Sequence, residues 1–169
     1  GNAGPSAMVT YYGNPEEDTM SFLNDQDAAF VRRRFEQELR DDVTLEFFAP
    51  SAGGLALPGQ DAEAAEYTRQ ILTEVAALSP KIHLNVHSLI GEPEVARRYG
   101  IDRTPATVIR GRTDFGIRFY GMPAGYEFAT LIEVILDVSK AEPALAERTK
   151  EVLGRLKDEA RIQVFVTPT

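Results

Sequence analysis

The stretch IDRTPATVIRGRTDFGIRFYGMPAGY, residues 101–126, decides the fold of this chain. Pro105 stands directly before a short apolar run at residues 106–109, and after a turn a second apolar run covers residues 115–120. Because proline has no N–H to donate to a neighbouring strand, it suits the first position of a strand and not its interior. The pattern predicts a β-hairpin led by proline. A cis Thr104–Pro105 bond would suit such a position, although most X–Pro bonds are trans.

Two more strands are predicted upstream of the hairpin. VTLEFFA at residues 43–49 is apolar on both faces, which is typical of a central strand. IHLNVHS at residues 82–88 alternates, with apolar residues on one face and His83, Asn85 and His87 on the other, which predicts a half-exposed strand near a sheet edge. Its two histidines would lie roughly 13 Å apart, too far to share a metal ion. We interpret them as surface residues and expect no metal site.

Helical spacing of apolar residues predicts five helices around these strands. The first begins near Asn24 or Asp25, either of which can accept a hydrogen bond from a free N–H of the first turn. The third has Pro93 in its first turn and ends at Gly100. A last strand is predicted at Arg161–Val166. The helical segments cover residues 21–39, 61–78, 92–99, 126–139 and 143–157.

Composition limits the classes of function. The 169 residues are 43% hydrophobic and 26% charged, which indicates a globular chain of one domain, or of one domain and a fragment. A net charge of -8 without a basic run argues against nucleic acid or an anionic membrane as a partner. We see no apolar run long enough to span a bilayer and no signal-peptide pattern, so we expect a cytoplasmic protein. The absence of cysteine excludes disulfides, thiolate metal sites and thiol chemistry in this chain.

Two segments resemble a known family. DFGIRFYGMPAGYEFATLIEVILDVS at residues 114–139 and RIQVFVTPT at residues 161–169 are similar to the glutaredoxin-like protein disulfide oxidoreductases, which carry two thioredoxin-fold units in tandem. The resemblance begins at about residue 21, is strong over residues 99–139 and is weak over residues 50–66. It implies an α/β, thioredoxin-like three-layer fold. That fold would be a four-stranded mixed sheet flanked by helices, with an extra N-terminal helix and a C-terminal extension.

The resemblance also implies domain boundaries. We interpret residues 1–19 as a tag and flexible tail, and residues 20–160 as one thioredoxin-fold unit. Residues 161–169 would be the first strand of a second, truncated unit. The apolar side chains of Arg161–Val166 would then need a covering surface, either on the sheet of the first unit or on another chain. The second alternative would produce a homo-oligomer.

The family's catalytic Cys-x-x-Cys pair would fall in the loop that follows the strand at residues 43–49. Counting forward from this strand places it among Ala52, Gly53, Gly54 and Leu55, whereas counting back from the next helix places it at Ala62 and Ala65. None of these residues can supply the thiolate that thiol–disulfide exchange requires. We therefore expect no catalytic residue in this chain.

Glu46, in the sequence EFFA, falls by the same resemblance at the position of the buried acid that assists the deeper cysteine of a thioredoxin. A carboxylate in an apolar setting is either neutralised by a raised pKa or paired with another group. In the alternative that we favour, Glu46 lies near the end of its strand and reaches water.

The proline loop is the remaining candidate site. By resemblance to a thioredoxin groove, backbone groups at Arg103, Thr104 and Pro105 could pair with an extended peptide. We therefore expect a redox-inactive thioredoxin-fold unit of an oxidoreductase, with a structural or peptide-binding role, thiol or disulfide proteins as partners and no cofactor. Two alternatives stay open. One is an interaction module that dimerises through Arg161–Val166, and the other is a glutathione-binding enzyme that uses no thiol.

Overall fold

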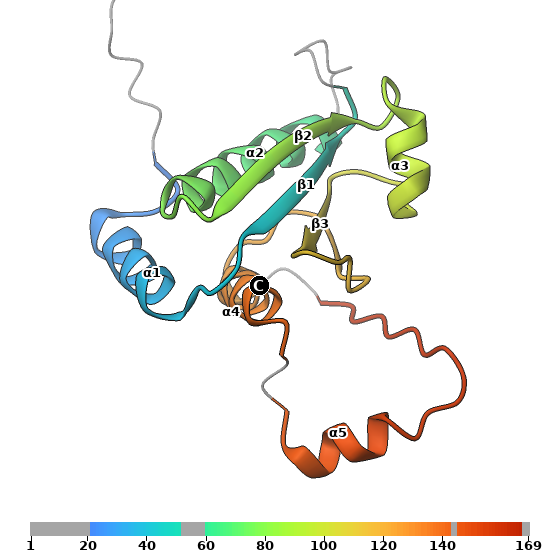
Figure 1. The fold of residues 1–169 in the computed structure, drawn as a ribbon. Coiled ribbons are helices and arrows are strands. Elements are labelled where there is room, and N and C mark those ends of the chain that lie inside the picture. Colours follow the sequence, from blue (N-terminus) through green and yellow to red (C-terminus); the bar gives the residue numbers. More distant parts are fainter. Residues whose placement is uncertain (1–20, 52–59, 143–144, 167–169) are drawn as a thin grey trace, which may run out of the picture.

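The protein is described by a computed structural model that covers residues 21–51, 60–142 and 145–166. Within these residues four strands form one mixed sheet in the order β2-β1-β3-β4 (Figure 1). The central strand β1 pairs in parallel with β2 and antiparallel with β3. β3 and β4 form the expected antiparallel hairpin. The strands are β1 (Val43–Ala49), β2 (Ile82–Ser88), β3 (Ala106–Arg110) and β4 (Arg118–Tyr120).

Helices cover both faces of this sheet. One hydrophobic cluster packs Leu45 and Phe47 of β1 against α1, α2 and α4, and a second, smaller cluster packs Phe48 against α3 and the loop after it. The expected α/β architecture with a four-stranded mixed sheet is therefore confirmed, including the extra N-terminal helix α1. The helices are α1 (Asp25–Glu38), α2 (Gln60–Ala77), α3 (Pro93–Tyr99), α4 (Tyr126–Lys140) and α5 (Glu147–Leu153).

Helix boundaries follow local capping chemistry. The Asn24 side chain accepts the N–H of Asp27 at 2.8 Å and caps α1. Gly100 ends α3 in the left-handed region at φ 66°, where its amide donates to carbonyls of the last turn. That turn sends the chain through Ile101, which is buried, into the proline loop. The loop is thus fixed by a helix stop on one side and by a strand on the other.

The second strand of the hairpin is shorter than the sequence predicts. A strand was expected from residue 115, but β4 begins only at Arg118. Asp114 accepts the backbone N–H of Gly116 at 2.9 Å, and Gly116 has φ +81°. This side-chain-to-backbone turn is an alternative to the ladder, so regular pairing starts only at Arg118, although the carbonyl of Ile117 still accepts the N–H of Ile109 at 3.4 Å.

The C-terminal part also differs from the sequence-based expectation. The helix predicted at residues 143–157 is limited to α5, which buries no residue and stands apart from the sheet (Figure 1). Residues 161–166 form no strand, and Ile162, Val164 and Phe165 are each more than four-fifths exposed. A strand needs a paired neighbour and a covered face, and among the described residues of this single chain the segment has neither, so its assignment to a second unit stays a prediction.

Among the helices that the structure describes, none is both long enough and apolar enough to cross a bilayer.

Candidate functional site

The proline loop joins α3 to β3. The Thr104–Pro105 peptide bond is cis. Pro105 is buried, Thr104 is half-buried and Arg103 is exposed. The carbonyl of Pro105 accepts the N–H of Gly121 at 2.9 Å, which ties the loop to the end of β4. Within the described parts of the chain, the backbone groups of Arg103 and Thr104 form no hydrogen bond with another backbone group.

The side chain of Arg103 lies on an aromatic ring. Its guanidinium carbon is 4.2 Å from the centroid of the Tyr120 ring. Among the side chains that the structure describes, the nearest carboxylate belongs to Asp102, 3.9 Å away, and both side chains of that pair are exposed. A planar guanidinium on an aromatic face is held in orientation while its N–H edge stays accessible.

The loop that was expected to contain the former active site lies outside the described residues. Ala52, Gly53, Gly54 and Leu55 all belong to that part of the chain. Their chemistry is settled by the sequence alone, because none of them is a nucleophile.

Glu46 is the most buried ionisable group that the structure describes, with 3% of its surface exposed. The expectation that it reaches water is therefore wrong. β1 is the central strand, and α3 covers the face on which Glu46 lies, so the carboxylate is enclosed away from the strand end. Five hydrogen-bond donors surround its two oxygens. Oε1 accepts Arg110 Nε at 2.9 Å, Arg110 Nη2 at 2.7 Å and the Tyr99 hydroxyl at 3.2 Å, and Oε2 accepts His87 Nε2 at 2.8 Å and Asn85 Nδ2 at 3.0 Å.

These contacts fix the charge state of Glu46. Burial by itself raises the pKa of this carboxyl group, because a charge is poorly solvated in the interior. Hydrogen bonds from His87, Arg110 and Asn85 act in the opposite direction and outweigh burial, so the pKa of Glu46 lies below its ordinary value. Glu46 is accordingly an anion at neutral pH. The same bonds raise the pKa of Arg110.

A chain of polar contacts runs outward from Glu46. His87 Nδ1 lies 3.2 Å from Glu92 Oε1, while Glu92 Oε2 accepts the backbone N–H of Ser88 at 2.9 Å. That backbone bond, with the contact to His87, lowers the pKa of Glu92. His87 can donate to both carboxylates at once only when both ring nitrogens carry a proton. The ring also stacks on Phe48, with centroids 4.9 Å apart.

The sequence argument missed this network, although the sequence carries a signal for it. In the parallel register of β1 and β2, Glu46 stands opposite Asn85, and Phe48 opposite His87. The face of β2 that was assigned to solvent is thus the face that meets the buried acid. His87 is half-buried, whereas Val86, expected to face inward, is 41% exposed. Aligning the two strands from their first residues, Val43 with Ile82, would have predicted that Asn85 and His87 lie beside Glu46.

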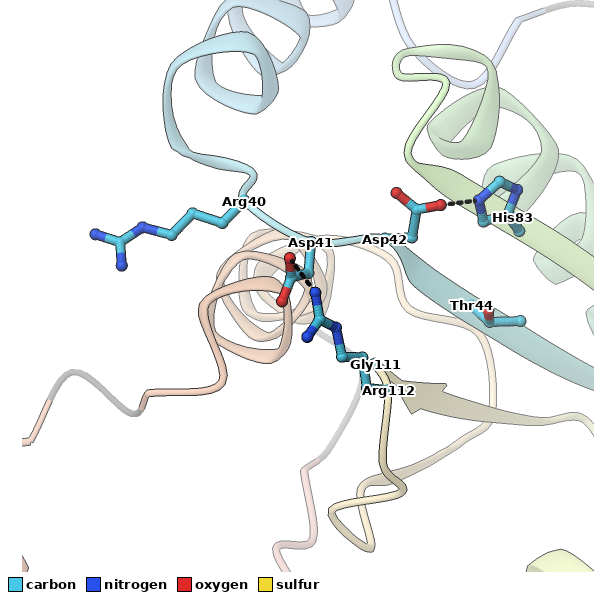
Figure 2. A pocket seen from close by; sticks show the side chains of 7 residues that line it. All are labelled: Arg40, Asp41, Asp42, Thr44, His83, Gly111 and Arg112. Atoms are coloured by element: carbon cyan, nitrogen blue, oxygen red, sulfur yellow. Dashed lines mark hydrogen bonds and ion pairs between the residues drawn. The ribbon is translucent and has the colours of Figure 1, made fainter.

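A surface pocket of about 410 Å³ lies at the N-terminal end of β1, away from the proline loop (Figure 2). Figure 2 shows Asp42 pointing to His83 and Asp41 pointing to Arg112, at 2.9 Å and 3.2 Å. The polar groups of this pocket thus pair with one another, and Arg40 points away from it. In the described ranges, no group of three or more His, Cys, Asp or Glu side chains could hold a metal ion. The proline loop and the Glu46 network remain as the candidate site.

Comparisons with known proteins agree with this geometry. The AhpF component of alkyl hydroperoxide reductase in Staphylococcus aureus is 28% identical over 126 residues, which is 74% of this chain but only 22% of that protein. The structure of the NTD_N/C domain of alkylhydroperoxide reductase AhpF from Enterococcus faecalis matches with a TM-score of 0.64 and 25% identity, over 77% of this chain and 59% of that one. A protein disulfide oxidoreductase from Aeropyrum pernix matches with a TM-score of 0.65 and 25% identity, over 79% and 55%.

No family model matches the sequence. The chain spans about a fifth of the length of the curated relatives that it matches. Its fold, its hairpin and its relatives nevertheless agree with one another. The chain thus has a thioredoxin-like fold, is similar to the N-terminal domain of alkyl hydroperoxide reductase AhpF and to a protein disulfide oxidoreductase, and contains no cysteine.

Proposed function

We propose that this chain is a redox-inactive thioredoxin-fold unit of a larger cytoplasmic thiol–disulfide oxidoreductase, where it has a structural role or binds an extended segment of a partner protein. The observation that carries the proposal is the absence of cysteine from a fold that is related to disulfide oxidoreductases. Disulfide exchange proceeds through attack by a thiolate, and this chain has none. Its contribution is therefore binding or support, and the redox chemistry belongs to another part of the protein.

The binding role is supported by the proline loop. Arg103 and Thr104 present backbone groups that pair with no other described backbone group, next to a sheet whose hairpin continues from Pro105. An extended peptide can add itself to such groups as an extra strand, and main-chain hydrogen bonds then supply the affinity. Proteins that carry thiols or disulfides are the expected partners.

The test combines a turnover assay with a binding map. Reduction of insulin by dithiothreitol should not be accelerated by the chain. Titration of the ¹⁵N-labelled chain with reduced, carboxymethylated insulin B chain should shift the amide signals of Arg103, Thr104 and Ala106, with weak affinity. Accelerated reduction would contradict the inert assignment. Absence of any shift at millimolar peptide, or a shift confined to other regions, would contradict the binding role and leave only the structural one.

A second candidate function rests on the exposed C-terminal segment. Ile162, Val164 and Phe165 are uncovered in the single chain, and exposed apolar side chains in a β-patterned segment favour pairing with another chain. An interaction module that dimerises through Arg161–Val166 would bury them. Light scattering decides this point, because a monomer at high concentration excludes dimerisation and a dimer that Val164→Asp dissociates supports it.

A further inference from the structure

Arg103 is an arginine whose orientation is fixed while its charge is left unsatisfied. The ring of Tyr120 holds the guanidinium from one face at 4.2 Å, and the arginine side chain is still 62% exposed. Its one carboxylate contact among the described residues, with Asp102, is long at 3.9 Å, and the Asp102 side chain is 76% exposed. Such a pair contributes little, because solvent screens it. The donors in the plane of the guanidinium remain free to bind an anion.

Two other arginines, one on each strand of the hairpin, differ from Arg103. Arg110 is bound to Glu46 through two nitrogens, at 2.7 and 2.9 Å. Arg118 is bound to Asp114 at 2.6 and 2.8 Å. It also donates to the carbonyl of Tyr99. Of these three arginines, only Arg103 has no close carboxylate in the part of the chain that the structure describes.

The position of the stack connects it to the proposed peptide site. Tyr120 is the register partner of Ala106, and the next residue, Gly121, donates to the carbonyl of Pro105. The Arg103–Tyr120 stack therefore adjoins the loop whose backbone groups would pair with a peptide. Tyr120 and Met122, the residues on either side of Gly121, are 37% and 44% exposed and add apolar surface next to the proline loop.

We propose that Arg103 selects the bound peptide, so that the site favours an extended segment with an acidic side chain flanked by apolar residues. This inference rests on the proposed peptide-binding function. A carboxylate and a guanidinium form two parallel charge-assisted hydrogen bonds, which a neutral side chain such as that of glutamine cannot reproduce. The aromatic platform fixes the guanidinium beforehand, so less conformational entropy is lost when the carboxylate binds.

The test uses the full chain and two end-blocked peptides, acetyl-GSVEVSG-amide and acetyl-GSVQVSG-amide, which differ only in the central residue. Blocking both ends makes the glutamate side chain the sole carboxylate. Dissociation constants come from NMR titration at about 50 mM salt, where screening is weak. We expect the glutamate peptide to bind about two- to fivefold more tightly, the range of a charged pair at a partly exposed site. In Arg103→Gln the preference should vanish, and in the matched control Arg112→Gln, at the far pocket, it should persist.

The outcomes distinguish charge selection by Arg103 from the proposed peptide binding on which it depends. Equal binding of the two peptides at Arg103 and Thr104 overturns the charge selection and leaves peptide binding intact. An undiminished preference in Arg103→Gln also overturns it. Absence of binding by either peptide overturns the inference together with the proposed function. A third peptide, acetyl-GSVQVSG with a free C-terminal carboxylate, distinguishes the source of the anion, because tighter binding of this peptide than of the glutamate peptide shows that the site takes chain ends rather than acidic side chains.

Discussion

Replacing Glu46 with glutamine tests whether the buried carboxylate stabilises the fold as an anion. Glutamine keeps the shape but loses the charge, and its NH₂ group must face donors in either orientation, from Arg110 and Tyr99 or from His87 and Asn85. Removing one member of a fully buried ion pair costs about 3–5 kcal/mol. The side chain of Arg110 is 31% exposed and water can reach it, so we expect a smaller loss of about 2–4 kcal/mol.

Urea unfolding followed by circular dichroism at pH 7 measures this loss. For a domain of this size, a loss of about 2–4 kcal/mol corresponds to a fall in melting temperature of roughly 4–16 °C. The matched control is Glu133→Gln, since Glu133 also pairs with an arginine, Arg34, but its side chain is 59% exposed. That change should cost less than about 1 kcal/mol.

The pH dependence of the free energy of unfolding provides a second test of the role of Glu46. Because the folded-state pKa of Glu46 is lowered, its charged form stabilises the protein fully above the unfolded-state pKa of about 4.3. That stabilisation is lost as the pH falls through the folded-state value. The stability gap between wild type and Glu46→Gln should therefore be largest at neutral pH and close at low pH. A gap below about 1 kcal/mol at pH 7, or one that widens on acidification, would refute the assignment of Glu46 as a stabilising anion.

Four further substitutions test the packing and the helix ends. Glu74→Ala removes the acceptor of the Phe22 and Leu23 amides, both at 2.8 Å, so these amides should exchange with solvent at least several-fold faster, and unchanged exchange would show that other contacts hold the segment. Ile162→Ala should change the melting temperature by less than about 2 °C, because the side chain is 85% exposed. Ile135 is fully buried, so Ile135→Ala should lower the free energy of unfolding by about 2–5 kcal/mol. Similar effects of the two substitutions would mean that residue 162 is covered. Gly100→Ala should cost about 1 kcal/mol in urea unfolding, since its φ is +66° while the space around a new Cβ is open, and a neutral result would mean that the turn relaxes.

The sheet could be predicted because its signals are local. Proline before an apolar run marked the start of β3, and apolar residues on both faces marked β1 as central. The helix stop at Gly100 and the cap at Asn24 follow from side-chain and backbone chemistry within a few residues. Each of these features depends only on residues of its own segment, so the sequence was sufficient to predict it and the structure confirms it.

The candidate site was less predictable because it depends on pairing between distant segments. Glu46, Tyr99 and Arg110 come from three elements, and only the register of β1 with β3 and the packing of α3 bring them together. Residues 161–166 show the opposite case. Their alternating apolar pattern predicts a strand from local sequence, yet without a neighbour the segment stays unpaired.

The electrostatics of Glu46 bear on the missing thiols. An acid that takes a proton from a buried thiol must accept it near neutral pH, which requires a raised pKa and few charged donors around the carboxylate. Glu46 has the reverse, since a guanidinium and three further side chains occupy both of its oxygens and lower its pKa. The carboxylate of Glu46 is therefore already bound to Arg110 and is unsuited to accept a proton from a thiol. The environment of Glu46 is thus consistent with the proposal that this unit does not itself exchange disulfides.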